Sequence, residues 1–262
     1  MSPWSLAGLG LTSGYILGSI PASYLICLWG WGVDLRKVGS GNPGATNALR
    51  SLGPKAGIPA LVLDAGKGVL AVLIARELSV TLWNLHPVTF QLACGLMAVV
   101  GHTFPLFLGF KGGKGVATAA GVMLTLSPVC VGLSVLVFGV TVTATRYVSL
   151  ASMIAASSFP LFTFFLVRDA RGPLVGLSTL LAAFIIYRHR DNVRRLLDGS
   201  ENKLGSCPQD PMTEISVTTD PADTSACSSG DVSAEENLEN QSDSVESTAP
   251  LDPDTARTEG VL

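Results

Sequence analysis

The chain has 262 residues, a formal net charge of −3 and five cysteines that stand far apart. Their spacing matches neither a disulfide framework nor a zinc site, so no disulfide scaffold and no metal are expected. The small net charge averages two unlike segments, and no nucleic-acid partner is expected for either of them.

The charge changes sign near Leu204. Residues 1–203 hold 16 of the 17 Lys and Arg residues and seven acids, about +9 in total, whereas residues 204–262 hold 13 acids and one base. The second segment also lacks Phe, Trp and Tyr, so it cannot bury enough apolar surface to offset the entropy of ordering it. We therefore expect a membrane domain over 1–203 and a disordered acidic cytoplasmic tail over 204–262. An acidic docking arm for a partner is the alternative for the tail.

Long apolar runs indicate a helical membrane protein. The first run begins at Leu6 and has no charge over 27 residues, more than the roughly 20 residues that cross a bilayer core. No Lys or Arg precedes it, which argues against a cleaved signal peptide. Pro128 ends the fourth run, which is short and rich in Gly and Thr. We predict an all-α bundle of about seven transmembrane helices, with six as the alternative; the later runs are 57–80, 88–106, 114–127, 129–145, 148–167 and 172–187.

The second run contains two charges within the membrane, Asp64 and Lys67. They are three residues apart on one helix face, so they can pair with each other. An ion pair that orients this helix is one interpretation. The other is that Lys67 reaches a cytoplasmic pocket.

Basic residues divide unequally between the two sets of loops. Seven spans put the termini on opposite sides of the membrane, and cytoplasmic loops carry the excess of Lys and Arg. With the C-terminus inside, the outer loops hold only Arg168 and Arg171, with Arg76 near the end of the second span. The N-terminus is therefore expected outside. Twelve bases then belong to the inner loops: Arg36, Lys37, Arg50, Lys55, Lys111, Lys114, Arg146, Arg188, Arg190, Arg194, Arg195 and Lys203.

The first polar segment on the inner side, 39–50, is rich in glycine and short polar side chains. Glycines let successive backbone N–H groups converge, and such concave clusters bind anions. Arg50 adds a planar fork that suits phosphate. A simple turn would explain the glycines but not the amides, the hydroxyls and the arginine. The candidate binding residues are Ser40, Gly41, Asn42, Gly44, Thr46, Asn47 and Arg50.

The second polar segment, 101–118, has two lysines around a pair of glycines and a helix start near Gly115. Helix N-termini favour phosphate because their N–H groups lack partners. The pattern is not a nucleotide P-loop, since Leu108 and Gly115 stand where that motif needs Gly and Ser or Thr. His102 is either a base or a hydrogen-bonding residue at a helix end. The candidate residues are Lys111, Gly112, Gly113, Lys114 and Gly115.

Two more polar segments complete the set. By itself, 145–152 is an ordinary basic loop, and 187–203 is a basic cluster that could contact lipid headgroups. His189 and Asn192, however, are three residues apart and share a helix face. Together the four segments predict a cationic, glycine-lined pocket with charge enough for two phosphate-bearing molecules. The loops contain no cysteine, no G-x-S-x-G and no His-x4-Asp, so no activated nucleophile is evident.

Three of these segments resemble the cytoplasmic motifs of the PlsY family, the acyl-phosphate-dependent glycerol 3-phosphate acyltransferases. They read GSGNPGATNALR, GHTFPLFLGFKGGKGVAT and RHRDNVRRLLDGSENK, and LDAGKG and RYVSLAS are also similar to family segments. The resemblance covers about residues 5–203. The acidic tail departs from the family pattern.

The resemblance implies a cofactor-free enzyme of the bacterial inner membrane with its active site facing the cytoplasm. It would transfer a fatty acyl group from acyl phosphate to glycerol 3-phosphate and give lysophosphatidic acid. Membrane lipid and the soluble enzyme that makes acyl phosphate are the implied partners. The implied catalytic residues are Ser40, Arg50, Lys114, His189 and Asn192, and the implied binding residues include Arg188 and Ser149, or Ser152 one turn on.

A transporter of a phosphorylated metabolite is the rival interpretation, because it would use the same cationic pocket. It should also have polar residues along an outward path. The outer segments 81–87 and 127–130 contain no charge, and His86 is their only titratable group. The sequence therefore favours the acyltransferase.

Overall fold

The computed structural model describes residues 2–79, 87–168 and 171–205, and each regular element within these ranges is a helix. The described residues belong to one compact unit. Apart from Leu204 and Gly205, the predicted acidic tail lies outside them. The helices are α1 (Pro3–Ser19), α2 (Ala22–Trp31), α3 (Ala45–Leu52), α4 (Pro54–Ser79), α5 (Pro87–Thr103), the 3₁₀ turn η1 (Leu106–Leu108), α6 (Val116–Leu126), α7 (Pro128–Thr145), α8 (Val148–Leu166), α9 (Arg171–Arg188) and α10 (Arg190–Leu197).

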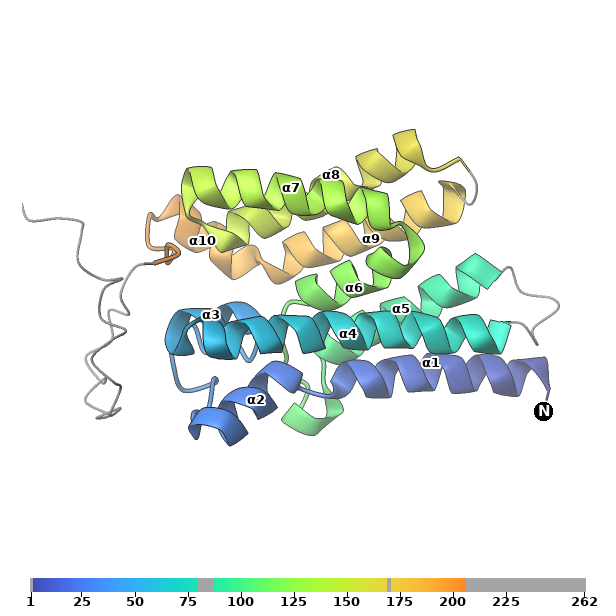
Figure 1. Ribbon diagram of the computed structural model, residues 1–262, viewed down its shortest axis with the longest axis horizontal. Helices are drawn as coiled ribbons and strands as arrows, with labels where there is room; N and C mark the ends of the chain where they lie inside the picture. Colours follow the sequence, from blue (N-terminus) through green and yellow to red (C-terminus); the bar gives the residue numbers. More distant parts are fainter. Residues whose placement is uncertain (1, 80–86, 169–170, 206–262) are drawn as a thin grey trace, which may run out of the picture. The chain divides into compact units, whose positions relative to one another are not determined.

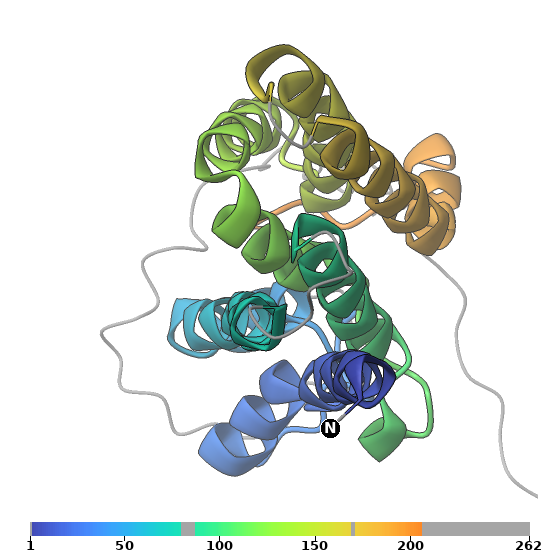
Figure 2. The same ribbon diagram turned by 90° about the vertical axis from the view of Figure 1, so that its right-hand side faces the viewer.

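The long helices lie side by side along one common direction (Figure 1). Viewed along the bundle, α1, α4 and α5 form one group, α7, α8 and α9 form another, and α6 lies between them (Figure 2). The polar segments 32–53, 146–147 and 189–205 lie at the same end of the bundle, on the left in Figure 1. Segment 104–115 lies nearer the middle of the bundle, because α5, with 17 residues, ends before the level that α4 reaches with 26 residues.

The predicted multi-pass helical bundle is confirmed, and the count of long spans reaches the predicted alternative of six. Among the described residues, five helices are long and apolar enough to cross a membrane, and α9 with α10 makes a sixth if their 55° bend is counted within one span. The fourth apolar run forms α6, which has only 11 residues. At about 1.5 Å per residue it reaches about half of a bilayer core of roughly 30 Å.

The first apolar run is broken into α1 and α2 at Pro21. Proline has no N–H to donate and restricts the residue before it, so Ile20 leaves the helical conformation. The break exposes the carbonyl of Ile20, which accepts a hydrogen bond of 3.0 Å from Lys67 Nζ of α4. The Asp64–Lys67 ion pair expected from the sequence is present at 2.9 Å.

Close helix contacts within the first group, and between that group and α6, depend on glycine. A Cβ atom on Gly18 of α1 would lie 2.1 Å from the carbonyl oxygen of Ala98 of α5. A Cβ on Gly121 of α6 would lie 2.0 Å from the carbonyl oxygen of Ala65 of α4. Small residues let membrane helices approach until their backbones touch, which gives packing energy where lipid offers no hydrophobic gain.

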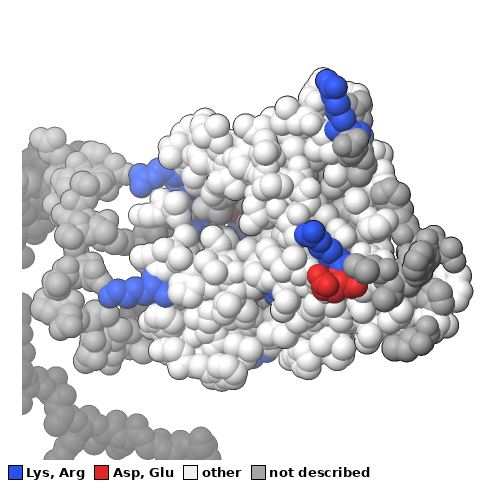
Figure 3. Space-filling view, turned by 45° about the vertical axis from the view of Figure 1, so that its right-hand side comes forward, with Lys and Arg blue, Asp and Glu red and all other residues white. Residues whose placement is uncertain are grey.

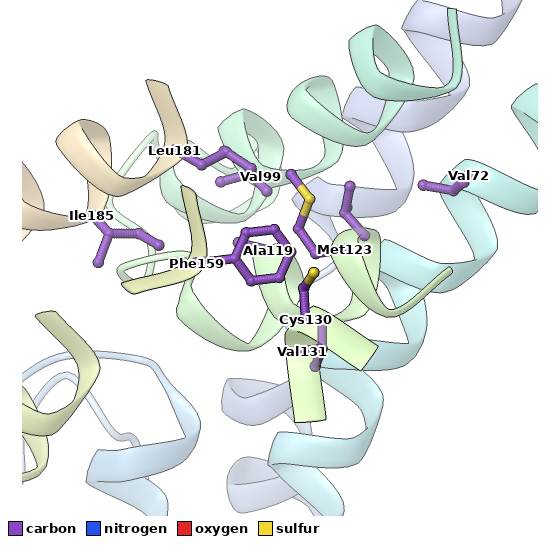
Figure 4. Close-up of a cluster of buried hydrophobic side chains, with 10 residues drawn as sticks. Val72, Val99, Ala119, Met123, Cys130, Val131, Phe159, Leu181 and Ile185 are labelled. Carbon is purple, nitrogen blue, oxygen red and sulfur yellow. The ribbon is translucent and has the colours of Figure 1, made fainter. Parts of the chain in front are cut away.

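An apolar cluster joins the two groups of helices around α6. Figure 4 shows its side chains directed toward one another from α4, α5, α6, α7, α8 and α9; they are Val72, Val99, Ala119, Val122, Met123, Cys130, Val131, Phe159, Leu181 and Ile185. The short α6 is thus held in place by core contacts. One face of the molecule has a broad band of uncharged residues with most of its visible Lys and Arg toward the two ends, as a membrane protein requires (Figure 3).

Candidate active site

Asn47 of α3 organises the first polar segment. Its buried side chain donates to the carbonyls of Leu35 and Val38, each at 3.0 Å, and accepts from the Ser40 N–H at 3.0 Å. Gly39 has a φ of +56°, and a Cβ there would lie 2.5 Å from Asn47 Oδ1, so only glycine fits. Asn47 therefore shapes the loop, and the Ser40 side chain is left exposed.

The shaped loop borders an open groove of about 460 Å³. The structure brings six of the predicted site residues into its wall: Ser40, Gly41, Asn42, Lys111, Gly112 and Arg188. Arg36, Pro43 and Phe110 complete the lining. Thr46, by contrast, is exposed on α3 and does not line the groove.

The second polar segment folds back along the end of α5. Gly112 N–H donates to the carbonyl of Thr103 at 3.1 Å, and Gly113 N–H donates to that of His102 at 3.2 Å. Gly115 has a φ of +79° and starts α6, as the sequence predicted. The turn directs Lys114 inward, where its ammonium donates to Asn192 Oδ1 of α10.

The bend between α9 and α10 presents His189 and Asn192, both of which are buried. His189 Nδ1 lies 2.7 Å from the carbonyl oxygen of Ile185. A carbonyl only accepts, so Nδ1 carries the proton and Nε2 of the neutral ring keeps a lone pair. His189 and Asn192 were predicted to share one helix face, and Asn192 on that face contacts Lys114.

Glu201 is the centre of this cluster, and the sequence interpretation had treated it only as one of seven acids. Its buried carboxylate accepts from Ser149 at 2.8 Å, from Asn192 at 2.7 Å and from Arg195 at 2.8 Å. The segment 187–203 also contains Asp191 and Asp198, so the sequence did not single out Glu201. Ser152 instead donates to the carbonyl of Val148, so Ser149 is the serine that joins the cluster.

Arginines from two segments complete the donor set. Arg50 Nη2 donates to the carbonyl of Asn202 at 3.0 Å, and Arg188 Nη2 donates to that of Gly113 at 3.3 Å. Within the described part of the chain, the buried Nε atoms of both arginines and Oδ1 of Asn42 have no hydrogen-bond partner. Buried N–H donors without acceptors are costly, so this cluster is suited to an anion.

Burial and crowded positive charge set the protonation of the cluster. Burial lowers the pKa of the Lys114 ammonium to about 8, opposed by Glu201 and assisted by Arg195, Arg50 and Arg188. Burial and the neighbouring Lys114 lower the pKa of His189 to about 4, so its ring is neutral at pH 7. Three hydrogen bonds help to lower the pKa of Glu201, although burial acts in the opposite direction.

A family described as "Glycerol-3-phosphate acyltransferase" matches residues 9–199 of this chain. The chain belongs to this acyltransferase family. A glycerol-3-phosphate acyltransferase of Geobacter sulfurreducens is 48% identical over 191 residues, which cover 72% of this chain and 93% of the relative. That of Geotalea daltonii is 46% identical over 190 residues, covering 72% and 92%.

Solved acyltransferase structures have the same fold. A crystal structure of PlsY, described as an integral membrane glycerol 3-phosphate acyltransferase in its glycerol 3-phosphate form, is 42% identical with a TM-score of 0.68. It covers 76% of this chain and 95% of its own. A lysophosphatidic acid form is 41% identical with a TM-score of 0.67 and covers 75% and 94%. The chain is thus a multi-pass membrane protein of the PlsY type.

Proposed function

We propose that this chain transfers a fatty acyl group from an acyl phosphate to glycerol 3-phosphate, giving lysophosphatidic acid and inorganic phosphate. The observation that carries the proposal is the cluster of half-buried cations, Lys114, Arg50 and Arg195, around the buried acid Glu201, with Arg188 near Lys114. A phosphate group matches this donor set in charge and geometry. The PlsY forms with glycerol 3-phosphate and lysophosphatidic acid support the acceptor and the product.

The proposed reaction is a direct transfer. The hydroxyl oxygen of glycerol 3-phosphate attacks the acyl carbonyl carbon, an ester C–O bond forms, and the C–O bond to phosphate breaks. Arg50 and Lys114 hold phosphate, while Ser40 and Asn192 orient the reacting groups. His189 Nε2 accepts a hydrogen bond from the attacking hydroxyl, which aligns it. Because a group with a pKa of about 4 is a weak base, the departing phosphate is the proposed final proton acceptor.

Acyl phosphate is proposed as the donor because it is already activated as a mixed anhydride. The described cysteines Cys27, Cys94 and Cys130 are buried in helices. The Ser149 hydroxyl donates to Glu201 and does not contact a histidine base in the described structure. A direct transfer without a covalent enzyme intermediate needs a donor with a good leaving group. The soluble enzyme that makes acyl phosphate is the proposed partner that supplies it.

Donor identity is tested with the purified full-length protein in detergent. We expect labelled glycerol 3-phosphate to become lysophosphatidic acid with acyl phosphate, and not with acyl-coenzyme A or acyl-carrier protein. Lys37→Met removes an exposed lysine outside the groove and serves as the control, with activity within about twofold of the parent. Activity with acyl-coenzyme A alone would exclude the proposed donor.

The active site is proposed to face the cytoplasm of the inner membrane, with the N-terminus outside. Twelve bases of the inner-loop set support this orientation. Single cysteines at the exposed positions Thr46 and Lys111, in a background without the five native cysteines, should react with an impermeant thiol reagent only in inverted vesicles. A cysteine at Arg171 should react only in right-side-out vesicles. The opposite labelling would reverse the topology.

A further inference from the structure

Behind the groove lies a second cluster of buried charge that the proposed reaction does not use. At its centre, Asp64 of α4 accepts from the Ser23 hydroxyl at 2.5 Å and pairs with Lys67 at 2.9 Å. Its Oδ1 atom also lies 3.5 Å from Nδ1 of His102, at the end of α5. All four side chains are buried. We name Ser23, Asp64, Lys67 and His102 the Asp64 cluster.

The Asp64 cluster joins every element that leads into the first two polar segments. Lys67 Nζ donates to the carbonyl of Ile20 at the break between α1 and α2. Thr118 of α6 donates to the backbone carbonyl of Asp64 at 2.9 Å. The contacts of Asp64 and Lys67 therefore link α1, α2, α4, α5 and α6 to one another.

The space between the Asp64 cluster and the groove is too small for a substrate. A cavity of about 10 Å³ is lined by Asp64, Lys67 and His102 together with Pro43 and Gly112. Pro43 and Gly112 also line the groove. A volume of this size holds at most one water molecule. The Asp64 cluster can therefore affect the groove only through the residues that separate the two.

His102 packs directly against the backbone of Gly112, which lines the groove, and of Gly113. A Cβ on Gly113 would lie 2.1 Å from His102 Nε2, and a Cβ on Gly112 would lie 2.1 Å from the His102 carbonyl oxygen. Gly113 is followed directly by Lys114, and its carbonyl accepts from Arg188. The imidazole ring therefore sets how closely the glycine pair, and with it Lys114, approaches α9 and α10.

We propose that His102, oriented by Asp64, is a positioning residue for Lys114. The ring supports the backbone of Gly113, which places the Lys114 ammonium against Asn192. His102 does not line the groove, so its proposed role is to support the backbone and not to transfer a proton. The inference rests on the proposed role of Lys114 in binding phosphate.

A double-mutant cycle tests the contact in the full-length protein. Gly113→Ala introduces the clashing Cβ, and His102→Ala removes the ring with which it clashes. We expect Gly113→Ala to lower kcat/KM for glycerol 3-phosphate about tenfold in the parent, but less than about twofold in the His102→Ala background. Gly66→Ala on α4 is the matched control, because a Cβ there meets no atom within 4 Å, and it should leave activity unchanged.

Equal losses in both backgrounds would overturn the inference, since they would show that Gly113 and His102 act independently. The same double-mutant cycle is repeated by calorimetric titration with glycerol 3-phosphate in the absence of any acyl donor. This measurement separates the inference from the proposal about the donor. A parent that binds glycerol 3-phosphate but does not use acyl phosphate contradicts only the donor. If Gly113→Ala does not fold, recovery of folded protein in the double variant supports the contact, and failure to recover overturns it.

Discussion

The protein contains two buried clusters of charge that differ in their balance. In the Asp64 cluster, one carboxylate pairs with one ammonium. Ser23 donates to the carboxylate of Asp64, and the ammonium of Lys67 donates to the Ile20 carbonyl. In the cluster around Glu201, the carboxylate pairs with Arg195, and Lys114 lies among Glu201, Arg195, Arg50 and Arg188. In the first, the charge of the carboxylate is offset by that of the ammonium. The second carries, among the described residues, an excess of positive charge that a bound anion would balance.

This difference separates structural from functional use of buried charge. A balanced pair can be deeply buried in a membrane bundle because its partner offsets the desolvation of each ion. An unbalanced cluster costs stability, and it is kept where a ligand repays that cost on binding. Substitutions in the two clusters should therefore have opposite effects on stability.

The largest effect is expected from breaking the balanced pair. Asp64→Asn leaves Lys67 buried without a counter-charge, which costs about 3–5 kcal/mol and lowers the thermal unfolding midpoint in detergent by roughly 10 °C. The double variant Asp64→Asn/Lys67→Met should recover part of the loss, because it removes the orphaned ion. A double variant less stable than Asp64→Asn would contradict the balance argument.

The next effect is loss of activity without loss of fold. Lys114→Met should reduce acyl transfer by about 10- to 150-fold, the equivalent of a charge-assisted contact to phosphate. Its unfolding midpoint should stay or rise, because a cation is removed from among arginines. Arg50→Met should behave in the same way, and Arg50→Lys should recover only part of the activity because an ammonium lacks the planar fork. Full activity in Lys114→Met would remove Lys114 from the mechanism.

A smaller effect is expected from pH. The Lys114 pKa of about 8 means that the free enzyme loses this positive charge as the pH rises through 8. Affinity for glycerol 3-phosphate should therefore fall by up to about tenfold between pH 7.5 and pH 9. Lys114→Arg, which stays charged, should bind more weakly at pH 7.5 but show a flatter profile. Calorimetric titration at several pH values measures both, and identical profiles for the two proteins would exclude Lys114 as the titrating group.

The smallest effect is expected from removal of the acidic segment. The charge of the site is set locally by Glu201, so truncation after Gly205 should leave the turnover number within about threefold of the parent. Gly205 is a better end point than Lys203, because Leu204 N–H donates to the carbonyl of Arg146 at 2.7 Å. A tenfold loss would show that the acids beyond Gly205 contribute to the balance of the site.

Local composition and spacing determined much of the architecture. Apolar runs predicted the helices, Pro128 marked the boundary between α6 and α7, and glycines marked the start of α6. The spacing of Asp64 and Lys67 predicted their ion pair because an α-helix places residues three apart on one face. Composition showed that α6 is apolar but not how far its 11 residues reach, so the sequence could not decide between six and seven spans.

The tertiary structure decided which polar residues meet. Composition assigned Asn47 to the binding loop, but the fold uses its side chain to hold the loop backbone. Glu201 became the centre of a cluster, and His102 became the support of Gly113, through contacts between segments far apart in the chain. Periodicity reports only neighbours within one helix. The contacts that build this site form between helices, and the packing of glycine surfaces and the apolar cluster around α6 sets their distances.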